Sequence, residues 1–248
     1  MAARKPVLSP TRIATFLECR RLYYYIYVRK FPRYFAPRPW FSLGTSLHRA
    51  LEQHHLAGGP REEDVAALVQ RLENVWVSAG YGSAEAAAAK LAEARQWLVA
   101  YHQEAPKLEG ETLFLEKSLR VDRGAYILSG RIDRLDRLPD GLLEVVDYKS
   151  GERVPTEADV ADDLAIAIYQ VLSSFTFQCP KVKGSLYHLA TNRKVSVVRD
   201  SAQLQEVARQ VDAVFAEVCA EQTFERRKSA RCERCDFHAR CWGGREHL

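Results

Sequence analysis

Two stretches of the chain decide the fold: Gly130-Arg131-Ile132-Asp133-Arg134-Leu135-Asp136 and Val145-Val146-Asp147-Tyr148-Lys149-Ser150-Gly151. Each has the alternating or apolar pattern of a β-strand, in which residues two apart share a face. The turn residues Pro139-Asp140-Gly141 separate the stretches and predict an antiparallel hairpin. In that hairpin Asp147 and Lys149 project together, and Asp133 can lie beside Asp147.

The predicted proximity of Asp133, Asp147 and Lys149 indicates a particular chemistry. Two neighbouring carboxylates repel each other unless they share a hard divalent cation such as Mg²⁺ or Mn²⁺. A lysine beside them can hold a water molecule or stabilise charge on a phosphate. The segment 142–146 is strongly apolar, and charged residues at the end of a buried strand usually have a specific role. The residues therefore predict phosphodiester hydrolysis, with ordinary Asp–Lys and Asp–Arg ion pairs as the alternative.

Outward from the hairpin, the chain alternates between helical and extended patterns. Residues 113–121, 125–138 and 142–149 predict three consecutive antiparallel strands, and residues 183–190 and 194–199 predict two more. Ser9 and Pro10 predict the start of a helix that runs into the tyrosines at 23–25. Further helices are predicted over residues 42–56, 61–78, 83–105, 159–177 and 201–221. The pattern indicates an α/β protein with a helical N-terminal part and a cysteine-rich tail.

Composition and charge narrow the class of protein. The chain has 248 residues, 47% hydrophobic and 27% charged, which excludes a disordered or low-complexity protein. Its net charge of +4 is uneven, because residues 1–40 hold nine Lys/Arg and one acid, and residues 224–248 hold seven Lys/Arg and four acids. Two basic ends thus flank an acidic middle. Arginine-rich ends favour a polyanionic partner, with solvated surface charge as the alternative.

The sequence has no mark of export or of a membrane. Residues 1–10 lack an apolar signal region, and no run of about 18 uncharged apolar residues occurs. Six cysteines without a signal peptide predict a reducing compartment, in which clustered cysteines more often bind metal than form disulfides. We therefore expect a cytoplasmic protein with a metal or cluster site.

The Gly-x-x-Asp strand and the Asp-Tyr-Lys-x-Gly strand resemble the PD-(D/E)XK nuclease superfamily, in its RecB-like branch. The resemblance implies that Asp133 and Asp147 bind the catalytic Mg²⁺ or Mn²⁺ and that Lys149 is the catalytic lysine. That branch also has a Gly-x-x-x-His pattern on a preceding helix, which Gly44-Thr45-Ser46-Leu47-His48 matches. His48 would then be a third metal ligand and part of the catalytic set. Glu52, one turn later, could face the same site.

Two neighbouring features fit the pattern less well. His54 and His55 match no motif, and we expect them to be exposed to solvent. The branch carries a Gln-x-x-x-Tyr motif on the helix after the lysine strand, and Tyr169 lies in that helix. Ala165 stands where the glutamine is expected. This departure puts the associated DNA contact in doubt, although not the metal site.

Four of the cysteines form a second candidate site. Cys232, Cys235 and Cys241 lie close together in the tail, and Cys19 lies near the other end of the chain. Four thiolates can hold zinc or an iron–sulfur cluster, but a zinc ribbon uses two Cys-x2-Cys pairs and this chain has one. The arrangement resembles the structural [4Fe–4S] staple of AddB-type and CRISPR-associated exonuclease families, with one cysteine before the core and three after it. A zinc staple is the alternative.

Basic and aromatic residues alternate near the N-terminus, a composition suited to single-stranded nucleic acid. A buried aromatic cluster beside a solvated arginine face is the alternative. We expect Arg20, Arg21, Arg131 and Tyr169 to contact DNA. The wider set in this segment comprises Arg12, Arg29, Lys30, Arg33, Arg38, Tyr23, Tyr24, Tyr25, Tyr27, Tyr34, Phe35 and Trp40.

Together the resemblance implies one nuclease domain over residues 1–248 with a restriction-endonuclease-like core, a small mixed sheet flanked by helices. Residues 1–110 would be the mainly helical part, 111–221 the core and 222–248 the cysteine module. The implied activity is metal-dependent DNA hydrolysis, as an exonuclease on single strands or DNA ends in repair, recombination or CRISPR adaptation. A helicase or CRISPR-adaptation protein is an implied partner. The alternative is a DNA-binding accessory subunit with a weak or vestigial nuclease site.

Overall fold

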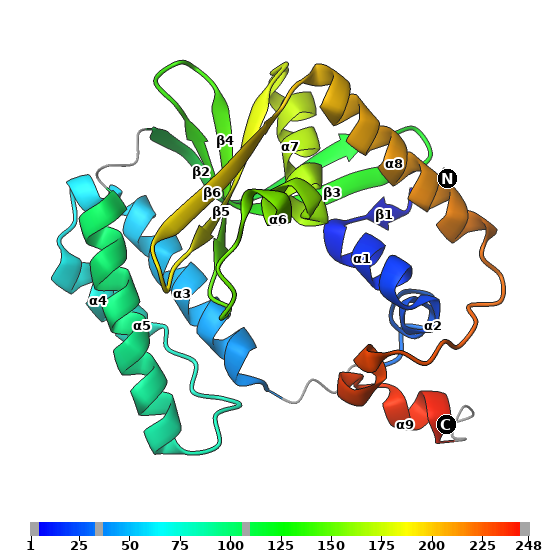
Figure 1. Cartoon of the computed structure of the whole chain (residues 1–248), viewed down its shortest axis with the longest axis horizontal. Helices are drawn as coiled ribbons and strands as arrows, with labels where there is room; N and C mark the ends of the chain where they lie inside the picture. Colours follow the sequence, from blue (N-terminus) through cyan, green and yellow to red (C-terminus); the bar gives the residue numbers. More distant parts are fainter. Residues whose placement is uncertain (1–4, 33–36, 106–109, 244–248) are drawn as a thin grey trace.

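A six-stranded mixed sheet forms the centre of the protein (Figure 1). The computed structural model describes residues 5–32, 37–105 and 110–243. The strands β2 (Glu111–Asp122), β3 (Ile127–Arg137) and β4 (Leu143–Lys149) are consecutive and antiparallel, as predicted. β5 (Val182–His188) lies parallel to β4, and β6 (Arg193–Arg199) lies antiparallel to β5. The two-residue strand β1 (Val7–Leu8), which the sequence did not predict, pairs in parallel with the start of β3.

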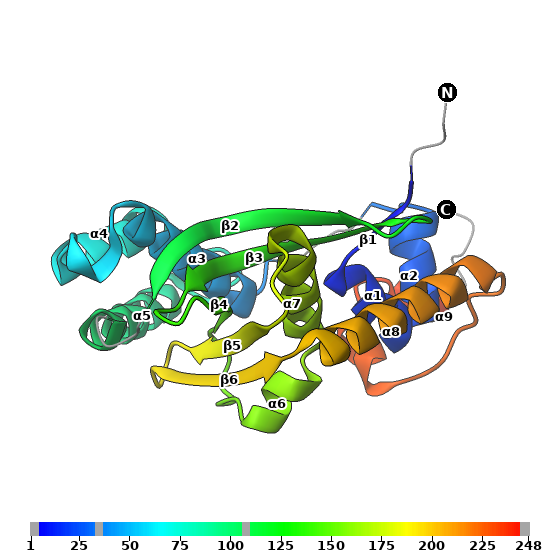
Figure 2. The same cartoon turned by 90° about the horizontal axis from the view of Figure 1, so that it is seen from above.

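Helices cover both faces of this sheet, since alternate residues of β4 point to opposite sides. Leu143 and Val145 pack against α7 (Leu164–Phe177) and α8 (Ser201–Ala220). Val146 and Tyr148 pack against α3 (Pro39–Leu56), α4 (Val65–Asn74) and α5 (Ala84–Glu104). Figure 2 shows the long β2–β3 hairpin reaching from the α3–α5 group to β1. The result is the expected α/β architecture, a mixed sheet flanked by helices.

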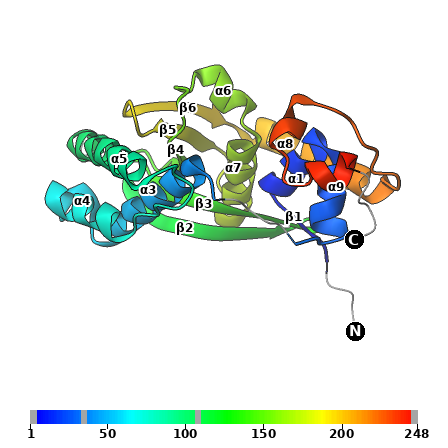
Figure 3. The ribbon, with the colours of Figure 1, turned by 90° about the horizontal axis from the view of Figure 1, so that it is seen from below.

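The first helices of the chain and its described C-terminal segment meet beside this core. The helices α1 (Pro10–Glu18) and α2 (Arg20–Tyr23), with the π-helix Tyr24–Val28, lie near α9 (His238–Trp242), as Figure 3 shows from below. A small aromatic core joins them, in which the buried Leu22 and Tyr25 contact Phe237. The short helical turn Ala230–Arg234 precedes α9. The proposed division into three regions remains a prediction.

Three predicted helices differ from the structure for local reasons. The first helix is interrupted at Cys19, whose backbone is extended and whose sulfur accepts a hydrogen bond from the Leu22 N–H. The helix expected over residues 159–177 is divided into α6 (Glu157–Asp162) and α7, because Asp163 caps α7 through the Ile166 N–H. The helix expected over 61–78 covers only α4, capped by Asp64. Within the part of the chain that is described, no helix is long and apolar enough to cross a membrane.

Candidate active site

The site forms where β4 separates from β3. β4 pairs with residues 134–137 of β3, and β1 pairs with residues 127 and 128, so Asp133 lies on a stretch of that edge between the two paired regions. The Tyr148 N–H donates instead to Asp133 Oδ2, at 2.9 Å. A side-chain carboxylate thus takes the place of the ladder partner at the point where the strands diverge. This geometry holds Asp133 and the motif Asp147-Tyr148-Lys149 together.

Three side chains converge on one point at this position. His48 Nδ1 lies 3.4 Å from Asp133 Oδ2 and 3.8 Å from Glu116 Oε1. Ligand atoms of His48, Glu116 and Asp133 all lie within 4.8 Å of one another, and no other such trio of His, Cys, Asp or Glu occurs among the described residues. Imidazole and two carboxylates are donors that Mn²⁺ and Mg²⁺ accept. The residues present therefore suit a divalent metal ion.

Glu116 is the member of this group that sequence reasoning missed. It lies opposite Asp133 in the hairpin, because Leu115 pairs with Arg134 and Lys117 pairs with Ile132. Its positive φ of 46° is uncommon for a glutamate and marks a local departure from the strand. The break between the predicted strands 113–121 and 125–138 contained the signal, since a hairpin that turns there places residue 116 across from residue 133.

His48 is oriented for metal binding by its other ring nitrogen. Nε2 lies 3.1 Å from the Tyr148 carbonyl oxygen, to which it donates, so Nδ1 faces the two carboxylates. A metal-binding histidine commonly donates its second N–H to a carbonyl in this way. Burial alone would lower the pKa of His48, but hydrogen bonding to Asp133 and Glu116 outweighs it and raises the pKa to about 10. The pocket is thus built to hold positive charge at this nitrogen.

Asp147 and Lys149 lie beside this trio. Lys149 Nζ is 2.7 Å from Asp147 Oδ2 and 3.7 Å from Asp163 Oδ2, so the N-cap of α7 also faces the lysine. Burial, followed by repulsion from Asp133, raises the pKa of Asp147 to about 6. Burial lowers the pKa of Lys149, yet the attraction of Asp147 is stronger and the net shift is upward. Lys149 is therefore a cation at neutral pH.

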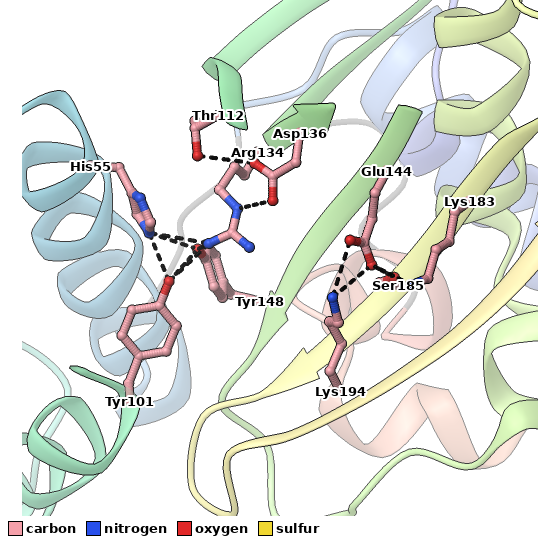
Figure 4. A network of polar contacts seen from close by, with 10 residues as sticks. All are labelled: His55, Tyr101, Thr112, Arg134, Asp136, Glu144, Tyr148, Lys183, Ser185 and Lys194. Carbon is pink, nitrogen blue, oxygen red and sulfur yellow. Dashed lines mark hydrogen bonds and ion pairs between the residues drawn. The ribbon is translucent and has the colours of Figure 1, made fainter. Parts of the chain in front are cut away.

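A buried polar network surrounds the Tyr148 side chain, next to the site (Figure 4). Arg134, 2% exposed, donates through Nη1 to the hydroxyls of Tyr101 at 2.8 Å and Tyr148 at 2.6 Å, and through Nε to Asp136 at 3.0 Å. The same Nη1 lies 3.1 Å from Nε2 of His55. The network fixes Tyr148, whose main chain contacts both His48 and Asp133.

A second buried group stabilises the middle of the sheet. Glu144 is fully buried on β4 and accepts from Lys194 at 2.9 Å and from the Ser185 hydroxyl. Lys183 lies 3.4 Å from the same carboxylate. Although burial opposes ionisation, Lys194 and Ser185 lower the pKa of Glu144 overall, so the carboxylate stays charged. This ion-pair group serves the sheet and is distinct from the candidate active site.

A cavity of about 410 Å³ opens onto His48 and Glu116, two of the three candidate metal ligands. One face of α3 lines it with residues spaced three or four apart, the spacing of one helix side. Arg131 and Glu116 contribute from the β2–β3 hairpin, and Arg131 Nε lies 2.6 Å from Glu116 Oε2. Glu52 also lines this cavity, as its position in the sequence suggested. From α3 the lining residues are Trp40, Phe41, Gly44, Thr45, His48, Arg49 and Glu52.

The residues predicted to contact DNA lie in different parts of the structure. Tyr169 packs against Gly130, where an added Cβ would lie 2.8 Å from the tyrosine ring. Burial and the nearby Asp147 raise the pKa of Tyr169. Arg131 lines the cavity, whereas Arg20 pairs with Glu217 and Glu221 on α8 and the segment after it.

Other predicted contacts lie among aromatic rings or outside the described residues. Arg21 lies over the rings of Tyr24 and Tyr25. Arg33, Tyr34 and Phe35 are outside the residues that the structure describes.

The expectation that His54 and His55 face solvent is wrong. His54 is fully buried and its Nδ1 lies 2.7 Å from Glu63 Oε2, because the segment before α4 covers the end of α3. His55 is partly buried and accepts from the Tyr101 hydroxyl at 2.7 Å. Burial and the Arg134 charge lower the pKa of His55 to about 2, so it stays neutral and accepts hydrogen bonds. Both histidines therefore have structural roles, because His54 joins α3 to the segment before α4 and His55 joins α3 to α5.

The four predicted cluster cysteines lie around one hollow. Cys19, Cys232, Cys235 and Cys241 all line a cavity of about 20 Å³, together with the aromatic core of the two chain ends. Among the residues that the structure describes, no three of these sulfurs lie within 4.8 Å of one another. Tetrahedral zinc, with Zn–S bonds of about 2.3 Å, needs sulfurs roughly 3.8 Å apart. The four sulfurs thus lie farther apart than four sulfurs bound to a single zinc ion would lie.

The two remaining cysteines lie elsewhere. Cys179 packs against the main core, and Cys219 is exposed on α8. Neither lines the hollow formed by the other four cysteines.

Comparison with known proteins identifies the family. The family profile described as "PD-(D/E)XK nuclease superfamily" matches residues 7–242. The chain belongs to the PD-(D/E)XK nuclease superfamily. Members of this superfamily use divalent metals, which agrees with the ligand set formed by His48, Glu116 and Asp133.

One solved structure supports the fold of this nuclease. A protein from Eubacterium rectale, titled "Putative exonuclease", has a TM-score of 0.57 at 12% identity, over 99% of this chain and 90% of that one. A second structure, titled SSO0001, has a TM-score of 0.32 at 16% identity, over 81% of this chain and 84% of that one, too low to support an argument. A search of curated proteins finds no match.

Proposed function

We propose that this nuclease is a Mg²⁺- or Mn²⁺-dependent deoxyribonuclease that acts as an exonuclease on single-stranded DNA or DNA ends. The observation that carries the proposal is the convergence of His48, Glu116 and Asp133 on one point, with Lys149 paired to Asp147 beside it. Three metal donors next to a buried carboxylate and a charged lysine suit hydrolysis of a phosphodiester better than any structural role.

The roles of the residues follow from their surroundings. His48, Glu116 and Asp133 would hold the metal ion, and Asp147 would complete its coordination. When bound, the ion supplies Lewis acidity toward a phosphate oxygen and toward water. Lys149 remains protonated, so it donates hydrogen bonds to the attacking water or to the charge that develops on the phosphate. Asp163 helps to hold the lysine in this position.

The proposal is tested by digesting single- and double-stranded DNA, labelled at the 5′ or 3′ end, with purified protein and Mn²⁺. We expect shortening from an end, and loss of at least about 100-fold in rate for Lys149→Ala and Asp147→Ala. Arg153→Ala is the matched control, because Arg153 forms an exposed ion pair with Asp159. Full activity in both active-site variants would refute the assignment. DNA binding without cleavage under several metals would favour the accessory-subunit alternative, which the alanine at position 165 suggests.

The cysteine hollow supports a second part of the proposal, a [4Fe–4S] cluster held by Cys19, Cys232, Cys235 and Cys241. All four line one cavity, and their spacing exceeds that of a zinc site. Burial and the nearby Cys19 raise the pKa of Cys235 and of Cys241, so these thiols stay protonated until a cluster binds them as thiolates. The cluster would close the loop between the chain ends and have a structural role.

Anaerobically purified protein should be brown, absorb near roughly 400 nm and contain iron and sulfide. Cys235→Ser should lose the colour, whereas Cys219→Ser should keep it. A colourless protein with one zinc would contradict this part alone, without affecting the nuclease site.

A further inference from the structure

Two large aromatic side chains at the start of α3 are exposed beside the candidate active site. Trp40 is 54% exposed and Phe41 is 60% exposed, and their ring centroids lie 6.0 Å apart. Both line the cavity that contains His48 and Glu116. Exposing two such rings forgoes the burial that normally stabilises aromatic residues. Their position therefore suggests a ligand that covers them.

The aromatic pair is held in place before any ligand arrives. Ser42 donates to the Ala79 carbonyl at 2.6 Å, and the Val77 N–H donates to Ser46 at 2.9 Å, so the loop after α4 fixes the first turns of α3. The guanidinium of Arg38 lies 5.3 Å from the centre of the Trp40 ring. Arg38 also contacts Asp236 in the cysteine-rich tail, at 3.2 Å. A rigid platform loses little entropy when it binds.

The chemistry of the cavity indicates what the rings bind. Arg49 is exposed on the same side of α3, and Arg131, 62% exposed, lies across the cavity. Flat rings next to arginines match the bases and phosphates of a nucleic acid. The bases of a duplex are already stacked on one another, so exposed rings on a protein select unpaired bases. Single-stranded DNA is therefore the ligand that fits both features.

The helix also sets the distance from the rings to the site of cleavage. Phe41 and His48 are seven residues apart on α3, a rise of about 10 Å at about 1.5 Å per residue. At about 3.4 Å per stacked nucleotide, this corresponds to about three nucleotides. We infer that Trp40 and Phe41 form a base-stacking platform for single-stranded DNA, about three nucleotides from the phosphate that is cleaved. The distance rests on the proposed nuclease function, although the stacking itself does not.

Binding without cleavage tests the platform directly. The affinity of a fluorescein-labelled oligothymidylate is measured by anisotropy in EDTA, with wild-type protein and with Trp40→Ala and Phe41→Ala. We expect each substitution to weaken binding about 5- to 150-fold, the range for loss of one stacked base. Phe175→Ala is the matched control, because Phe175 is 45% exposed on α7 and lies outside the cavity. Unchanged urea midpoints would show that the variants are folded, as expected for exposed side chains.

The position of stacking is tested with oligonucleotides that contain a single abasic site at successive positions. Wild-type protein should lose affinity when the abasic site stands at one or two adjacent positions. The double variant Trp40→Ala, Phe41→Ala should bind all of these oligonucleotides equally well. Wild-type protein that binds no single-stranded DNA, or a double variant with wild-type affinity, would overturn the platform. If Lys149→Ala still abolishes cleavage in that case, the proposed nuclease stands. Stacking without metal-dependent cleavage would instead support the platform and refute the nuclease.

Discussion

Arg134 provides the sharpest test of how the fold supports the site. Its guanidinium is 2% exposed and contacts Asp136, Tyr101, Tyr148 and His55. Replacing it with methionine leaves the apolar volume but removes the charge that compensates Asp136, which is itself 5% exposed. Removing one partner of a buried ion pair costs about 3–5 kcal/mol of unfolding free energy. At about 2 °C per kcal/mol for a chain of this length, Tm should fall by about 6–10 °C.

The double variant Arg134→Met, Asp136→Leu separates the charge effect from packing. Apolar replacement of a whole buried ion pair is often neutral, so the double variant should recover at least half of the lost stability. Tyr101 and Tyr148 keep a partner in both cases, because their hydroxyls lie 3.1 Å apart and His55 accepts from Tyr101.

Urea unfolding followed by circular dichroism measures all of these variants. Arg153→Met, which removes an arginine that is 81% exposed, should change stability by less than about 1 kcal/mol. A loss below about 1 kcal/mol for Arg134→Met, or a double variant no more stable than the single one, would refute the reasoning.

Three further variants test other parts of the structure. Glu116→Gln should weaken Mn²⁺ binding at least about 10- to 100-fold by calorimetry, since it removes a charged ligand, whereas the exposed Glu85→Gln should not. Gly130→Val should cost about 1–3 kcal/mol in urea unfolding, because its Cβ would lie 2.8 Å from α7 side chains. Burial opposes the ionisation of Asp212, but hydrogen bonds from Arg123 and Tyr126 lower its pKa overall. The ionised Asp212 therefore stabilises the fold fully above its unfolded pKa of about 4, and this stabilisation is lost as the pH falls through the lower folded pKa. The loss of unfolding free energy in Asp212→Asn should accordingly become smaller as the pH is lowered.

The central hairpin could be predicted because its local signals agree. The turn at 139–141 and the apolar strand before Asp147 predict the pairing that the structure has, in which Arg134 lies opposite Val146. From this register alone, Asp133 had to lie near Asp147. Motif order then singled out His48, whose ring does reach Asp133.

The features that sequence reasoning missed depend on tertiary contacts or on single backbone angles. Glu116 lies across from Asp133, as the hairpin turn implies, but its positive φ is a backbone detail that no strand pattern encodes. The burial of His54 comes from a segment nine residues later in the chain, through Glu63. Part of the basic N-terminal charge is balanced locally, since Arg20 pairs with Glu217 and Glu221. Net charge along the sequence therefore overstated the basic surface near Arg20.

The most direct test of the central claim is to locate the metal ion. A crystal of the protein grown with Mn²⁺ gives anomalous scattering from the ion itself. The account predicts one peak bonded to His48 Nδ1 and to carboxylate oxygens of Glu116 and Asp133, and loss of that peak in Asp133→Asn. A protein that cleaves DNA with Mn²⁺ but binds the ion at another place, with this trio empty, would contradict the account.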